Sequence, residues 1–123
     1  MERTLFIAGS LLAGFSVAMG AFAAHGAQKF MTEQQLGWME KAARYNMYHA
    51  LAILVIVWAL TQWPGQVALL SWASWLFVAG IVLFSGSLYV MAFSPLRLGI
   101  VTPLGGVAFI LGWVLMAIAA WKS

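Results

Sequence analysis

Long uncharged stretches separated by short polar segments define the predicted architecture of this chain. The apolar runs cover about residues 4–24, 45–63, 67–93 and 102–121. Each has about the length at which a helix, rising about 1.5 Å per residue, crosses a hydrocarbon core of about 30 Å. Backbone polar groups in lipid must be satisfied within the protein, and runs without period-two alternation exclude a closed β-barrel. The pattern therefore predicts an all-α membrane protein with four transmembrane helices.

The segment 32–44, between the first two predicted spans, has a different pattern. Thr32 and Gln35 have the spacing of a capping box, in which the two side chains satisfy free backbone N–H groups. Apolar residues then follow one helical face, and Glu40 precedes Arg44 by four residues, which favours an ion pair. We predict an amphipathic helix that either lies along the membrane interface or forms the first turns of the second span.

Four spans with short connections predict an up-down-up-down bundle that makes up one domain, residues 1–123. In this topology odd spans end, and even spans begin, on the same side of the membrane. By this count most polar residues of the chain gather at one end. We predict that they form a polar vestibule at one membrane face: His25, Glu40, Arg44, Tyr45, Asn46, Tyr48, His49, Ser85, Ser87, Tyr89, Arg97 and Thr102.

Tryptophan marks the opposite end of the predicted bundle. An aromatic belt at the headgroup level would consist of Trp58, Trp63, Trp72, Trp75 and Trp121. Of the six Lys and Arg residues, four fall on the vestibule side. Because cytoplasmic loops carry an excess of Lys and Arg, this distribution favours a vestibule that faces the cytoplasm.

Composition agrees with a membrane protein and narrows the possible chemistry. Only 7% of the 123 residues are charged and 64% are hydrophobic, whereas about a quarter of a soluble domain is charged. The cations are scattered singly, so we predict membrane lipids and no nucleic acid as partners. Cysteine is absent, which excludes disulfides, iron–sulfur clusters, thiolate zinc sites and cysteine nucleophiles.

Small residues recur at helical spacing and predict close helix packing. Ser10, Gly14 and Ala18 form one row on the first span, and a second row combines Ser16 with Gly20 and Ala24. Such rows let helix backbones approach each other in lipid. We expect packing within the chain, with a homo-oligomer or another membrane protein as the alternative. The predicted packing glycines are Gly14, Gly20, Gly86, Gly105, Gly106 and Gly112.

The polar end allows several kinds of chemistry, and the residues leave them open. His49 and its polar neighbours could serve only as hydrogen bonds between helices, as in a structural or accessory membrane protein. They could instead bind or transport an ion, lipid or small ligand with the help of Arg44 and Arg97. Another alternative is a metal or bis-histidine haem site at His25 and His49. Catalysis would have to combine His49 with a serine, so we predict no enzyme and no cofactor.

Several blocks of the sequence resemble a family of small bacterial inner-membrane proteins named domain of unknown function 423. The blocks are residues 20–25 (GAFAAH), 45–52 (YNMYHALA), 84–89 (FSGSLY) and 102–106 (TPLGG), followed by Phe109, Gly112 and Trp113. One departure is Asn46, where the family often has the longer amide Gln. The resemblance implies a four-span protein of the bacterial inner membrane, and it implies no activity.

Overall fold

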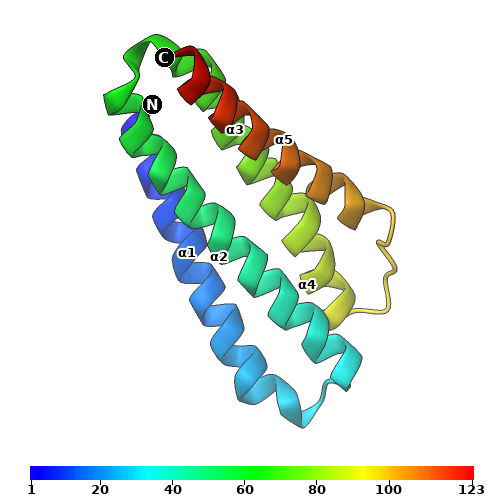
Figure 1. Cartoon of the computed structure of the whole chain (residues 1–123). Coiled ribbons are helices and arrows are strands. Elements are labelled where there is room, and N and C mark those ends of the chain that lie inside the picture. Colours follow the sequence, from blue (N-terminus) through cyan, green and yellow to red (C-terminus); the bar gives the residue numbers. More distant parts are fainter.

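Five α-helices and three short helical segments make up nearly the whole chain, and no strand is present (Figure 1). The computed structural model describes all residues from Met1 to Ser123. The α-helices are α1 (Glu2–Ala24), α2 (Glu33–Gln62), α3 (Val67–Gly80), α4 (Gly86–Phe93) and α5 (Val101–Lys122). Two 3-10 segments, η1 (Gly26–Lys29) and η2 (Pro64–Gln66), follow α1 and α2, and the π-helical turn η3 (Ile81–Ser85) joins α3 to α4.

Four helical stretches are long and apolar enough to cross a membrane, which confirms the predicted fold class. Because η3 continues α3 into α4, these two helices form one stretch with η2, Pro64–Phe93. The π-turn is a local widening of this stretch, in which the Gly86 N–H donates to the Ile81 carbonyl five residues earlier. The spans therefore follow one another up and down, as predicted.

The amphipathic segment 32–44 belongs to the second span. Thr32 caps α2, and both hydrogen bonds of the predicted capping box with Gln35 are present. The predicted ion pair between Glu40 and Arg44 also forms, on the exposed side of the helix. Of the two alternatives, the structure has the one in which the segment forms the first turns of α2. As a result α2 has 30 residues and is about 45 Å long, more than a bilayer core requires.

The spans form an open row, with α2 between its neighbours. α1 packs along α2, and α2 packs on its other side against α3, η3 and α4. α5 packs on α3 and η3, whereas α2 and α5 have almost no backbone contact. Figure 1 shows the two resulting hairpins, α1 beside α2 and α3 beside α5. This arrangement leaves one flank of α2 and one flank of α5 facing a common gap.

Two apolar clusters fill the interior of this row. Near the α1–α2 connection, Met31 and Met39 pack with Leu88 and Met91 of α4. Toward the other end, a second cluster joins all four spans around Leu5, Ile53, Ile56, Leu70, Phe77, Phe109 and Ala119. The core therefore runs the length of α2.

Glycines bring α5 close to α3 and η3. A Cβ at Gly105 would overlap the backbone of Phe84, and one at Gly112 would overlap the Phe77 ring. In the reverse direction, a Cβ on Gly80 of α3 would overlap the Phe109 ring of α5. Gly105 and Gly112 were predicted as packing glycines, and Gly80 was not. Aromatic rings thus fit into glycine positions on the facing helix.

The other predicted packing glycines have looser surroundings. A Cβ at Gly20 would meet only Ala43 at 3.8 Å, so this residue does lie at the α1–α2 contact. Gly86 and Gly106 have room for a Cβ, and Gly14 faces open space with the rest of its row. The prediction that Gly14 packs against another helix of the chain is therefore wrong. The glycine of α1 that packs closely is Gly9, whose Cβ would lie 3.1 Å from the Ala50 carbonyl oxygen.

The adjacent residues Gly105 and Gly106 of α5 allow a matched test of the close approach between α5 and η3. We expect Gly105→Ala to destabilise the fold by about 1–3 kcal/mol, because the new methyl group must displace the Phe84 backbone. Gly106→Ala meets its nearest neighbour at 4.0 Å and should be neutral or slightly stabilising, since alanine favours helix. Unfolding followed by circular dichroism in detergent measures both. Equal stability of the two variants would contradict the close approach.

Candidate functional site

His49 lies near the middle of the membrane-spanning region and not at its mouth. Its Nε2 accepts a hydrogen bond from Trp113 Nε1 of α5 at 3.1 Å. At about 1.5 Å per residue, Trp113 is about 18 Å from Val101 and about 14 Å from Lys122, the two ends of α5. The predicted apolar run 45–63 is therefore only part of the second span, which is the helical stretch Glu33–Gln62. Because α2 begins twelve residues before Tyr45, the end of the last charged stretch does not mark the membrane surface.

The hydrogen bonds of His49 occupy both ring nitrogens. Nδ1 lies 2.7 Å from the Tyr45 carbonyl oxygen, one turn earlier on α2. A carbonyl can only accept, so Nδ1 carries the proton and Nε2 is free to accept from Trp113, as in a neutral imidazole. The ring also stacks on Phe109 of α5, with centroids 3.5 Å apart and an interplanar angle of 6°. His49 therefore bonds α2 to α5 and has no free nitrogen for a ligand.

Other polar side chains form hydrogen bonds between the spans in the same way, most of them with α2. Ser85 Oγ of η3 donates to the Ala42 carbonyl at 2.8 Å, and Ser16 Oγ of α1 donates to the Ala43 carbonyl. Asn46 Nδ2 donates to the Tyr89 hydroxyl of α4 at 3.1 Å. Ser87 and Thr102 add a bond of 2.6 Å between α4 and α5. Each of these contacts between spans thus includes a buried or part-buried hydrogen bond, as the structural interpretation of the sequence expected.

Asn46 is the exception to complete pairing in this polar centre. Its side chain is fully buried, and Oδ1 has no hydrogen-bond partner in the protein. Rotating the amide would let the Tyr89 hydroxyl donate to Oδ1, but the amide nitrogen would then be unpaired. One half of the Asn46 amide is therefore unsatisfied in either orientation.

The predicted vestibule residues do not line one cavity. Some are buried between helices, as described above, and the others lie exposed at different places. His25 follows α1 at the connection to η1, and Arg44 pairs with Glu40. Arg97 lies over the Trp38 ring, 5.7 Å from its centroid, and donates to the carbonyls of its own loop. The prediction of a shared polar vestibule is corrected: α2 carries half of these residues, and they point in different directions around its axis.

The two histidines are also far apart. Ser16 contacts Ala43, which fixes α1 and α2 side by side and antiparallel. His25 lies nine residues beyond Ser16 in one direction, and His49 lies six residues beyond Ala43 in the other. Their separation along the helices is about 20 Å at about 1.5 Å per residue. The alternative of a metal or haem site that uses both imidazoles is therefore wrong. No group of three or more metal-ligating side chains occurs in the chain.

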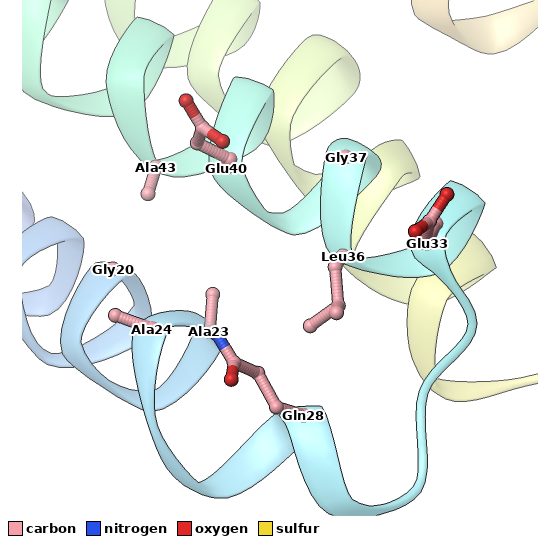
Figure 2. Close-up of a pocket in the computed structure, with 9 residues that line it drawn as sticks. All are labelled: Gly20, Ala23, Ala24, Gln28, Glu33, Leu36, Gly37, Glu40 and Ala43. Carbon is pink, nitrogen blue, oxygen red and sulfur yellow. The ribbon is translucent and has the colours of Figure 1, made fainter.

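Two grooves remain as candidate sites, and the first lies between the loop-side ends of α1 and α2. It has a volume of about 490 Å³ and is lined by Gly20, Ala23, Ala24, Gln28, Glu33, Leu36, Gly37, Glu40 and Ala43. Figure 2 shows Leu36 of α2 and Ala23 of α1 pointing into the space between the helices. The Glu40 carboxylate points away from α1 in the same view. Small and apolar side chains thus form the walls, and carboxylates lie at the rim.

The second groove lies between α2 and α5 and has a volume of about 500 Å³. Its walls are mostly aromatic: Tyr45, Tyr48, His49, Phe84, Gly106, Phe109, Ile110 and Trp113. The sequence pointed to the residues from α2 as polar candidates. It did not predict that Phe109 and Trp113 would face them, although their i,i+4 spacing on α5 is the signal that could have indicated it.

Comparison with known proteins places the chain among membrane proteins of unknown function. Residues 19–106 match the family described as "Protein of unknown function (DUF423)". The chain belongs to this family. It is 43% identical to a UPF0382 membrane protein of Staphylococcus aureus over 98% of this chain and 97% of the relative. It is 40% identical to the UPF0382 membrane protein YwdK of Bacillus subtilis over 98% of each.

A relative from Haemophilus influenzae, also named a UPF0382 membrane protein, is 40% identical over 89% of this chain and 86% of its own length. No solved structure matches the chain. The family confirms the resemblance drawn from the four sequence blocks. It also confirms that the chain is an integral membrane protein. The names of the relatives state no function.

The bond between His49 and Trp113 can be measured with a double-mutant cycle. His49→Phe and Trp113→Phe each remove one partner and keep an aromatic ring in the groove. We expect the free energies of unfolding to be non-additive by about 0.6–2 kcal/mol, the range for hydrogen bonds between membrane helices. Unfolding in mixed micelles with increasing dodecyl sulfate would give the values. Additive effects within about 0.3 kcal/mol would argue against a bond between the two helices.

Proposed function

We propose that this protein is a non-enzymatic accessory protein of the bacterial inner membrane that acts by lateral contact with a larger membrane protein. The observation that carries the proposal is the use of the interior polar groups. Ser16, His49 and Ser85 all make hydrogen bonds between spans, and none is left free for a substrate. Because the interior polar groups hold the helices together, we infer that the protein acts through its lateral surface.

The same observation argues against the catalytic alternative. A serine nucleophile needs a base within hydrogen-bond reach. Ser85 donates to the Ala42 carbonyl, and Ser87 bonds to Thr102 and to the Phe84 carbonyl. Both His49 nitrogens already have other partners. No serine–histidine pair is therefore assembled.

Transport through the chain is also disfavoured. Beyond His49, toward the end with Trp63, the interior polar side chains are those of Ser71 and Ser74. Ser74 bonds back to the Leu70 carbonyl of its own helix, and Ser71 Oγ has no partner. A path for an ion would need polar groups or water along its whole length. Two serines, one of them bonded to its own helix, do not make such a path.

Helical spans and bacterial relatives support the inner membrane as the location. Proteins of bacterial outer membranes are typically closed β-barrels, which this chain is not. Large apolar side chains on the outer faces of the helices, among them Leu11 of α1 and Val82 of η3, provide the lateral surface.

Site-specific photo-crosslinking in living cells tests the accessory role. A photoreactive residue is placed on each outward face, at Gly14, Val55, Val82 or Val114, all exposed positions. We expect one face to form a defined adduct with a second, larger protein, and the other faces to act as internal controls. Proteoliposomes that contain the purified chain should leak protons and cations no faster than empty vesicles. The proposal fails if no face crosslinks to protein, or if a flux appears that His49→Phe removes.

A further inference from the structure

The groove between α2 and α5, which we call the α2–α5 seam, opens sideways toward lipid. The backbones of α2 and α5 have almost no contact, and the bond between His49 and Trp113, with the stacking of His49 on Phe109, forms the floor between the two helices. The flanking side chains Tyr48 and Ile110 are 52% and 63% exposed. At about 500 Å³ the seam has the size of typical ligand sites, which are about 300–1,000 Å³. In a membrane, the acyl chains of lipids would contact the open side of the seam.

Two phenols give the seam a polar feature on the loop side of His49. The rings of Tyr45 and Tyr48 lie 5.6 Å apart, and neither hydroxyl has a hydrogen-bond partner in the protein. Side chains on a helix lean toward its N-terminus, so both phenols point toward the loop-side membrane surface. An unpaired hydroxyl is costly at membrane depth. A ligand that brings a carbonyl to this level would satisfy the phenols, as the esters of a glycerolipid do.

Two cations lie above the phenols, toward the same membrane surface. Lys41 is one turn before Tyr45 on the same face of α2, and its long side chain can extend to the headgroup level. Trp38 is two turns before Tyr45 on that face and carries Arg97 over its ring. Neither cation has a carboxylate partner, since the ion pair of the chain is Glu40–Arg44. Neither charge is therefore neutralised by a carboxylate, and each can attract an anionic group.

The carboxylates of this end of α2 lie on its other side. Glu33 and Glu40 line the α1–α2 groove and not the seam (Figure 2). Glu40 is about 100° from Lys41 around the helix axis, which separates the two signs of charge. The loop-side end of α2 therefore presents acidic groups toward α1 and basic groups toward α5. An anion is attracted to the seam and repelled from the neighbouring groove.

We propose that the α2–α5 seam binds one anionic glycerophospholipid. An acyl chain lies against Phe109 and Trp113, the ester groups accept hydrogen bonds from Tyr45 and Tyr48, and the phosphate lies between the two free cations. This site does not depend on the accessory role, because it requires only the geometry of the seam. It would hold even if the protein had no protein partner.

Native mass spectrometry of the protein released from nanodiscs tests the headgroup preference. The nanodiscs contain equal amounts of phosphatidylcholine and phosphatidylglycerol. We expect phosphatidylglycerol to remain bound at one molecule per chain. The double variant Lys41→Gln with Arg97→Gln should retain it less, by about fivefold for each cation removed. Lys29→Gln with Lys122→Gln removes the same charge elsewhere and should leave retention unchanged.

A second pair of variants tests the acyl-chain site. Gly106 lines the seam and has room for a side chain, its Cβ position being 4.0 Å from Phe84. Gly106→Leu should fill the seam and abolish lipid retention while circular dichroism shows an unchanged helix content. Gly14→Leu places the same side chain on the open face of α1 and should retain lipid normally.

Three results would overturn the proposal. One is equal retention of phosphatidylcholine and phosphatidylglycerol by the unchanged protein, which would indicate unselective surrounding lipid. Another is full retention by Gly106→Leu, which would place the lipid elsewhere. The third is a mass of two chains without lipid, which would show that a second copy covers the seam.

Discussion

The hydrocarbon core of a membrane offers no hydrogen bonds, and this constraint explains why α2 is the organising helix of the fold. Each polar group that enters the membrane must find its partner in the protein. α2 supplies those partners within about two turns: the Ala42 and Ala43 carbonyls accept from Ser85 and Ser16, and His49 accepts from Trp113. Such bonds are modest individually, about 0.6–2 kcal/mol, but they specify which helices become neighbours.

α5 is held by a different interaction, and the difference produces the open row. Phe109 fits over Gly80, and Gly112 receives Phe77, so α5 binds closely to α3. The π-turn contacts both α5 and α2, because adjacent residues within it face different helices. Phe84 meets Gly105 of α5, and Ser85 bonds to α2. Once α5 is committed to α3 and η3, it cannot also pack along α2. The seam is the geometrical consequence.

Features that depend on nearby residues could be predicted from the sequence, and features that depend on facing surfaces could not. Span number, the capping box and the Glu40–Arg44 pair follow from local pattern, and all are present. Gly80 was missed because its importance lies in the ring opposite it. The acceptors of Ser16 and Ser85 are backbone carbonyls, which carry no sequence signal. The depth of His49 was missed because charged residues can continue a helix into the membrane region when they are paired or can reach its surface.

A histidine near the centre of a membrane protein usually suggests a functional site. In this chain its two nitrogens are engaged and its ring is stacked, so it acts as a joint between α2 and α5. The groups that remain without a carboxylate or hydroxyl partner are the phenols of α2 and the cations Lys41 and Arg97, which lie between this joint and the membrane surface. The joint sets the floor of the seam, and the free groups lie along its wall and at its entrance. The chemistry available to a ligand therefore begins where the helix-to-helix bonding ends, on the flank of α2 that α5 leaves uncovered.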